Sequence, residues 1–124
     1  DSDGSPAIQS IIMDIRKNAN VIKDILTAAN EHAQKQYFDK HGEPAYCGFA
    51  WVEVPVTRTN SKEAKDLMAL GFRKSWLPKI VDYRVPQVVG HYGQSMDLKI
   101  QGANAMVDEL QKLGIKAYVR SRPD

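Results

Sequence analysis

The fold of this chain is decided by one stretch, Tyr46-Cys47-Gly48-Phe49-Ala50-Trp51-Val52-Glu53-Val54. Successive residues of a strand point to opposite faces, and here both sets are largely apolar. This pattern is typical of a central strand that is covered on each side. Gly48 and Ala50 are the small residues of one set, so we expect another element to approach closely on that side.

Upstream of this strand, apolar side chains recur at alternating spacings of four and three residues, which predicts a helix from about Pro6 to Phe38. Ser5 and Pro6 are favoured at a helix start, and Gly42 commonly follows a helix end. Packing on the domain's own sheet, homodimerisation through Ile8–Ala33 and docking on a partner are all open, because the apolar stripe is broad. The stripe consists of Ile8, Ile12, Ile15, Ala19, Ile22, Leu26, Ala29 and Ala33, widened by Ile11, Val21 and Ile25.

Downstream of the strand, a short helix and a second strand are predicted. Asn60 is expected to cap the helix, with Glu63 returning the hydrogen bond, and Gly71 to end it. Lys79 to Val85 alternates between apolar and polar residues, which indicates a half-exposed strand. Residues 87–93 fit either a further short strand or a glycine-hinged loop.

A third helix and a last strand complete the expected order of elements. Ser95 is predicted to cap the helix, which Gly114 closes, and Ile115 to Arg120 alternates as a strand. The sequence therefore predicts an α+β fold, with a three- or four-stranded sheet, a long N-terminal helix and two further helices.

Length and composition limit the class of protein to which the chain can belong. The chain has 124 residues, which fits a flexible stretch over 1–5 followed by a single domain over 6–124. Its 43% apolar and 26% charged residues are close to globular averages, so disorder throughout is not expected. No apolar run approaches about 18 residues, so we expect no membrane span. A single cysteine, Cys47, favours the reducing cytoplasm.

The net charge of +2 is unevenly distributed. Residues 1–44 carry five basic and seven acidic side chains, whereas residues 58–84 carry seven and three, and residues 112–124 carry four and one. A positive face built from the two basic segments would attract phosphate groups or an acidic partner. An ordinary solvated surface is the alternative interpretation.

The basic C-terminal segment also contains an aromatic residue. Tyr118, Arg120 and Arg122 occupy alternate positions, so one face of the last strand would present a ring and two guanidinium groups. Arginine beside an aromatic ring suits phosphate contact combined with base stacking. We therefore predict a site that binds nucleic acid or a protein partner, consisting of Arg73, Lys74, Lys116, Tyr118, Arg120 and Arg122.

Candidate chemistry elsewhere is sparse. The three histidines, His32, His41 and His91, lack the spacing of metal ligands, and no glycine-rich phosphate loop is present, so no metal or cofactor is expected. Cys47 lies in an apolar strand and is predicted to be buried and inert. We identify no catalytic residue. The alternative is a ligand pocket at a capped helix start, formed by Gln94, Ser95 and Asp97 with Arg120.

Three segments resemble small uncharacterised proteins encoded by tailed phages and other mobile elements. These segments are 47–52, 93–97 and 116–122, and the resemblance covers residues 44–124. It implies no activity, but it implies an accessory factor that acts on host machinery or nucleic acid in the cytoplasm of a bacterial host cell. The favoured hypothesis is therefore a non-enzymatic binding module. A small enzyme or a protein that binds an anion or nucleotide is the alternative.

Overall fold

The computed structural model describes residues 14–43, 46–90 and 95–124. These parts of the chain contain three helices and four strands, which confirms the predicted α+β fold. In chain order they are α2 (Ala19–His41), β1 (Gly48–Pro55), α3 (Lys62–Ala69), β2 (Arg73–Lys74), β3 (Ile80–Arg84), α4 (Met96–Lys112) and β4 (Tyr118–Pro123).

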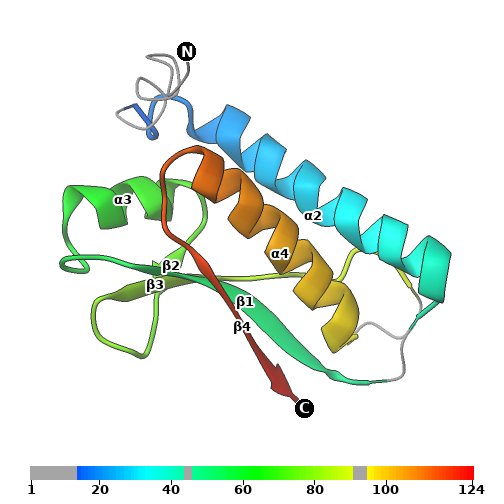
Figure 1. Ribbon diagram of the computed structural model, residues 1–124. Coiled ribbons are helices and arrows are strands. Elements are labelled where there is room, and N and C mark those ends of the chain that lie inside the picture. Colours follow the sequence, from blue (N-terminus) through cyan, green and yellow to red (C-terminus); the bar gives the residue numbers. More distant parts are fainter. Residues whose placement is uncertain (1–13, 44–45, 91–94) are drawn as a thin grey trace.

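The strands form one antiparallel sheet in the order β2-β3-β1-β4 (Figure 1). β1 lies between β3 and β4, which confirms its predicted central position. Because β1 and β2 are both antiparallel to β3, they run parallel to each other on either side of it, as in the split β-α-β motif. β2 was not predicted, since a strand of two residues has no periodicity to detect.

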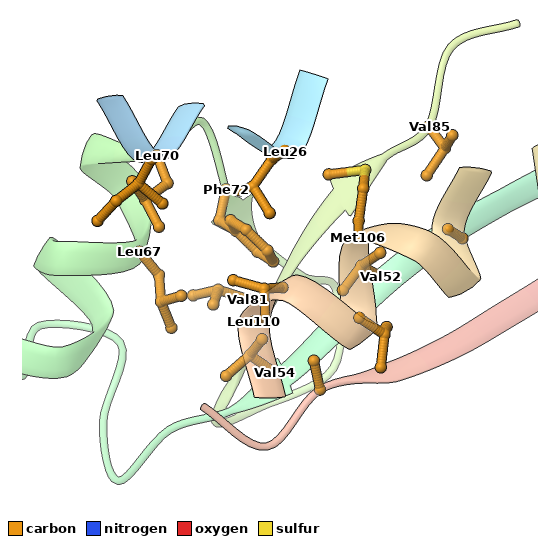
Figure 2. Packing of buried hydrophobic residues seen from close by; sticks show 14 of the residues in the cluster. Leu26, Val52, Val54, Leu67, Leu70, Phe72, Val81, Val85, Met106 and Leu110 are labelled. Carbon is orange, nitrogen blue, oxygen red and sulfur yellow. The ribbon is translucent and has the colours of Figure 1, made fainter. Parts of the chain in front are cut away.

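The helices lie on one face of the sheet. α4 packs on β1 and β4, and α2 packs along α4 (Figure 1). Figure 2 shows the resulting core, in which Val52 and Val81 of the sheet meet Leu110 of α4 and Leu26 of α2. The expected close approach at Gly48 is confirmed, because a Cβ there would lie 2.6 Å from the carbonyl oxygen of Arg122.

The prediction that β1 is covered on both sides is wrong for the parts of the chain that the structure describes. Ala50, Val52 and Val54 are buried under the helices, whereas Phe49 and Trp51, on the other face, are only half-buried. A strand that is apolar on both faces has the same sequence pattern in two cases. Its second face can be covered by a helix or only by neighbouring side chains.

The long helix begins later than predicted. α2 starts at Ala19, and residues 14–18 form turns, so the helix does not run continuously from Pro6, which itself lies outside the described residues. Its end at His41 is three residues beyond the predicted Phe38. Gly42 follows with φ 73°, the left-handed conformation that favours glycine at a helix end.

Two further boundaries differ from the predictions. Ser61, not Asn60, caps α3, since its hydroxyl accepts a hydrogen bond from the Ala64 N–H at 3.2 Å. Glu63 instead accepts from the backbone N–H of Thr57 at 2.9 Å. The last strand runs from Tyr118 to Pro123 rather than from 115 to 120. Its start is delayed because the N–H of Ile115 still closes α4, donating to the Leu110 carbonyl at 3.0 Å.

A buried polar cluster on α2 binds the segment that follows β3 and packs against α4. Gln34 is fully buried, and its Nε2 donates to Asn30 Oδ1 at 2.6 Å and to the Pro86 carbonyl at 2.8 Å. Its Oε1 accepts from the Val88 N–H at 3.0 Å. Gly102 of α4 lies directly against the two amides, because a Cβ there would collide with Asn30 Oδ1.

Candidate functional site

The sheet face opposite the helices carries a mixed aromatic and charged surface. Residues paired across antiparallel strands point to the same side, so the register assigns this face. One row, from β2 to β4, is Arg73, Asp82, Glu53 and Tyr118, and the next is Arg84, Trp51 and Arg120. None of the helices in the described parts of the chain covers it (Figure 1). We call it the open face, and its members are Phe49, Trp51, Glu53, Arg73, Asp82, Arg84, Tyr118, Arg120 and Arg122.

Trp76 lies beside the open face, on the turn between β2 and β3. This turn is ordered by its own hydrogen bonds, since the Ser75 N–H donates to the Ile80 carbonyl at 3.0 Å and the Ser75 hydroxyl accepts from the Leu77 N–H at 3.1 Å. Trp76 nevertheless remains 87% exposed. An indole left in water on an ordered turn contributes little to the core, and tryptophan is enriched among residues that dominate binding energy.

At the centre of the open face, Glu53 holds two neighbours in place. Its Oε2 accepts from Trp51 Nε1 at 2.9 Å, and its Oε1 accepts from Arg120 Nε at 3.2 Å. The carboxylate side chain is only 7% exposed, so this charge needs both partners. The network therefore fixes the indole plane of Trp51 and the direction of Arg120.

Asp82 lies next to Glu53 in the β1–β3 register. Burial raises the pKa of the Asp82 carboxyl above its ordinary value, a hydrogen bond with Ser75 opposes the shift, and the negative charge of Glu53 adds to it. Asp82 forms no ion pair with any residue in the described ranges. The two carboxylates thus differ, because Glu53 is enclosed by its partners while Asp82 lines a hollow of the open face.

Two cations approach the ring of Phe49. Lys99 of α4 reaches past the start of β1, with its Nζ 4.9 Å from the ring centroid and 3.1 Å from the Gly48 carbonyl oxygen. Burial lowers the pKa of Lys99, although the charge of Asp124 opposes this shift. The Arg122 guanidinium lies 5.9 Å from the same centroid. Both distances are within the range of a cation–π interaction.

The open face is hollowed where these groups meet. A cavity of about 220 Å³ is lined by Phe49, Ala50, Trp51, Trp76, Asp82, Arg84, Val85, Lys99 and Arg122. A wider hollow of about 800 Å³ shares Trp76, Asp82 and Arg84 with this cavity and extends to Arg73 and Lys74 at the β2 edge. Four arginines and two carboxylates lie on the open face, which leaves a local excess of positive charge.

The structure brings together only part of the predicted binding site. Tyr118, Arg120 and Arg122 lie on the open face along β4, and Arg73 lies on it at the opposite edge of the sheet. Lys74 pairs with Val81, so its position belongs to the helix-covered side. Lys116 precedes β4 and lines a different cavity, which also includes residues of α3.

The predicted ligand pocket and Cys47 lie near the start of β1. Gln94 is outside the described residues. Ser95 caps α4 by accepting from the Leu98 N–H at 3.3 Å, and Asp97 follows in the first turn. Ser95 pairs with Cys47, whereas Arg120 pairs with Trp51 further along β1. The prediction that Cys47 is buried is wrong, because Cys47 precedes the strand and is exposed.

The predicted self-association surface is partly visible. Val21 and Ile25, which widen the apolar stripe, are 60% and 46% exposed, whereas Ile22 and Leu26 are buried in the core. Ile8 and the rest of the stripe before residue 14 lie outside the described residues. Homodimerisation through this helix stays a prediction.

Sequence reasoning missed the centre of the site, namely Trp51, Glu53, Trp76, Asp82 and Arg84. The available signal was the alternation of Phe49, Trp51 and Glu53, which places a carboxylate beside two aromatic rings on one face of β1. The partners of these residues on β3 are set by strand pairing, which local periodicity does not encode.

None of the helices in residues 14–43, 46–90 and 95–124 has the length and apolar character needed to cross a bilayer. In the same ranges, no three His, Cys, Asp or Glu side chains are grouped so that they could hold a metal ion. Comparisons with protein-family models, curated proteins and solved structures find no match to this chain.

Proposed function

We propose that the open face binds single-stranded nucleic acid and that the protein is a non-enzymatic binding module. One observation carries the proposal: half-buried and exposed aromatic rings and four arginines share a sheet face that no described helix covers, and the exposed Trp76 lies beside it. Four-stranded sheets that display aromatic side chains in this way are one known means of binding single-stranded RNA. Architecture alone does not assign function, so the argument rests on the side chains.

The aromatic residues suit unpaired bases. Trp51 and Phe49 lie on the central strand, Tyr118 is 48% exposed on the edge strand, and Trp76 projects from the turn. Stacking of a base on such a ring is worth about 1–3 kcal/mol and needs an accessible base face. In a duplex the base faces are already stacked on one another, so these rings favour single strands.

The charges suit a strand whose phosphates lie off the centre of the face. Glu53 and Asp82 are adjacent in the middle of the sheet, where they would repel a phosphate. Arg73 lies at one edge of the sheet and Arg122 at the other. We therefore place the bases over the centre and the phosphates toward the arginines.

Binding is favoured over catalysis because Glu53 is already occupied. Its two oxygens accept from Trp51 and Arg120, which leaves Asp82 as the remaining carboxylate that lines the hollow. A general acid–base pair needs two groups that can exchange protons with a substrate, and Lys99, which also lines the hollow, already contacts the Gly48 carbonyl oxygen and the Phe49 ring.

The test is fluorescence anisotropy of labelled oligonucleotides at several salt concentrations. We expect a single strand of mixed sequence to bind at low salt and the same sequence as a duplex to bind at least about tenfold more weakly, because stacking is unavailable. The test variant is Arg84→Ala combined with Arg122→Ala, since neither arginine forms an ion pair within the described residues. Each lost phosphate contact should reduce the salt slope by about 0.7 for single strands.

A matched control removes the same charge from the opposite side of the molecule. Lys23 and Lys35 are exposed on α2, and Lys23→Ala combined with Lys35→Ala should leave binding nearly unchanged. Equal losses in both double variants would indicate non-specific attraction to a positive protein. Absence of binding to any oligonucleotide at low salt would overturn the proposal and leave a protein partner as the better candidate.

A further inference from the structure

The cavity between the aromatic side chains points to the kind of base that the open face selects, an inference that rests on the proposed function. Its volume of about 220 Å³ is below the roughly 300–1,000 Å³ of sites that take drug-sized ligands. A space of this size suits one ring system rather than a whole nucleotide chain. Phe49, Trp51 and Trp76 line it, and Asp82 adds a carboxylate.

The carboxylate of Asp82 is available to a ligand in a way that Glu53 is not. Glu53 is held by Trp51 and Arg120, whereas Asp82 has a hydrogen bond with Ser75 and no ion pair in the described parts of the chain. An ionised carboxylate only accepts hydrogen bonds, and its two oxygens can accept from two neighbouring donors. Such a pair is stronger where water is partly excluded.

Among the common bases, guanine alone offers two adjacent donors on its Watson–Crick edge, N1–H and the exocyclic amino group. Cytosine and adenine place a ring-nitrogen acceptor beside their amino group. Thymine and uracil flank their single N–H with two carbonyl oxygens. A carboxylate therefore attracts both positions on guanine and meets at least one repulsive acceptor on each of the other bases.

We propose that this cavity binds an unpaired guanine, with Asp82 accepting from N1–H and the exocyclic amino group and with Trp51 and Trp76 contacting the ring. Arg84 and Arg122, which also line the cavity, would contact the phosphates next to that guanine. Asp82 is then the residue that determines base specificity, while the aromatic residues supply affinity for any base.

The test compares oligonucleotides that differ at one position. The probes are thymidine octamers with a central guanine, inosine, adenine or cytosine and the all-thymidine octamer, at pH 8 and fixed salt, with anisotropy as the readout. A bidentate pair is worth about 1–3 kcal/mol, so guanine should bind about 5- to 150-fold more tightly than thymine. Inosine lacks the exocyclic amino group and should fall between them.

The variant Asp82→Asn keeps the shape of the side chain but replaces one acceptor oxygen with a donor. It should bring the affinity ratio of guanine to thymine down to about one, and loss of the negative charge, which repels phosphate, should tighten binding of the all-thymidine octamer. Glu53→Gln is the matched control, and because Glu53 acts through Trp51 and Arg120 it should weaken all octamers by a similar factor. The comparison of guanine with inosine in the wild-type protein needs no variant, so it stands even where a variant folds poorly.

Equal binding of all five octamers by the wild type, with the salt dependence intact, would overturn the guanine assignment and leave the proposed function standing. The same holds if Asp82→Asn keeps the full preference for guanine. Failure of every octamer to bind at low salt would overturn both proposals.

Discussion

Replacing Trp76 with alanine should separate binding from stability. Trp76 is 87% exposed, so about an eighth of its surface is buried by the fold. For a side chain of roughly 250 Å² and about 25 cal/mol per Å², this burial is worth about 0.8 kcal/mol at most. The turn is held by hydrogen bonds of the Ser75 N–H and the Ser75 hydroxyl, which the substitution leaves in place. We therefore expect the melting temperature of the variant to stay within a few degrees of the wild-type value.

Binding should change far more. Loss of one stacked base costs about 1–3 kcal/mol, which corresponds to a Kd about 5- to 150-fold higher. The increase should be similar for every single-stranded sequence, because every base has a face that can stack. Trp76→Phe keeps a ring on the turn and should recover part of the affinity.

Anisotropy with a single-stranded oligonucleotide and a thermal melt of the same samples would measure both effects. Val21→Ala removes another exposed apolar side chain, on α2, and serves as the control for unspecific changes of the surface. Unchanged affinity in Trp76→Ala would refute the role of this ring in stacking. A large fall in melting temperature would instead mean that Trp76 supports the fold.

Four further outcomes follow from the structure. Gly102→Ala should lower the free energy of unfolding, measured in urea, by about 2–4 kcal/mol. The added Cβ breaks buried amide hydrogen bonds worth about 1–3 kcal/mol each, while the higher helix propensity of alanine returns roughly 1 kcal/mol. Equal or higher stability would contradict the packing of α2 on α4. Burial raises the pKa of Asp82, so its ionised form costs stability above that pKa, and Asp82→Asn should be more stable than the wild type at pH 7. That gain should vanish in urea unfolding as the pH falls below the ordinary range of an aspartate, near about 4, and a gain that is independent of pH would refute the cause. Cys47 is exposed, so a maleimide should label the native protein to one equivalent without denaturant; labelling only after unfolding would show that the thiol is protected. If α2 mediates homodimerisation, sedimentation velocity at micromolar concentration should detect a dimer, and the double variant Val21→Lys with Ile25→Lys should be monomeric. A monomeric wild-type protein would contradict homodimerisation through α2.

The secondary structure followed from local patterns wherever those patterns were strong. The strand around Val52 alternates over eight residues, and α4 has a capping serine, an apolar stripe and a closing glycine. Weak or competing signals produced the errors. Asn60 and Ser61 are adjacent capping residues, and composition alone does not choose between them. A two-residue strand such as β2 exists only through its pairing with β3.

The candidate site was much less predictable than the fold. The aromatic and basic residues of β4 were recognised, because Tyr118, Arg120 and Arg122 are neighbours on one strand. Trp51, Glu53 and Asp82 were not recognised as a group, since their association depends on the register between β1 and β3. The exposed position of Trp76 was not visible either, because an indole in a sequence gives no indication of which side of a turn it occupies.

Three of the residues that sequence reasoning missed have features that do not favour the stability of the fold. Trp76 keeps most of its apolar surface in water, Glu53 carries a charge into a poorly solvated position, and Asp82 has its pKa raised by burial. Each of these features lowers or fails to raise stability when the molecule is considered alone. A ligand that stacks on the indole and donates hydrogen bonds to Asp82 would reverse two of them at once. Local conflicts of this kind tend to accumulate at functional sites, and here they lie together on or beside the one sheet face that the described helices leave open.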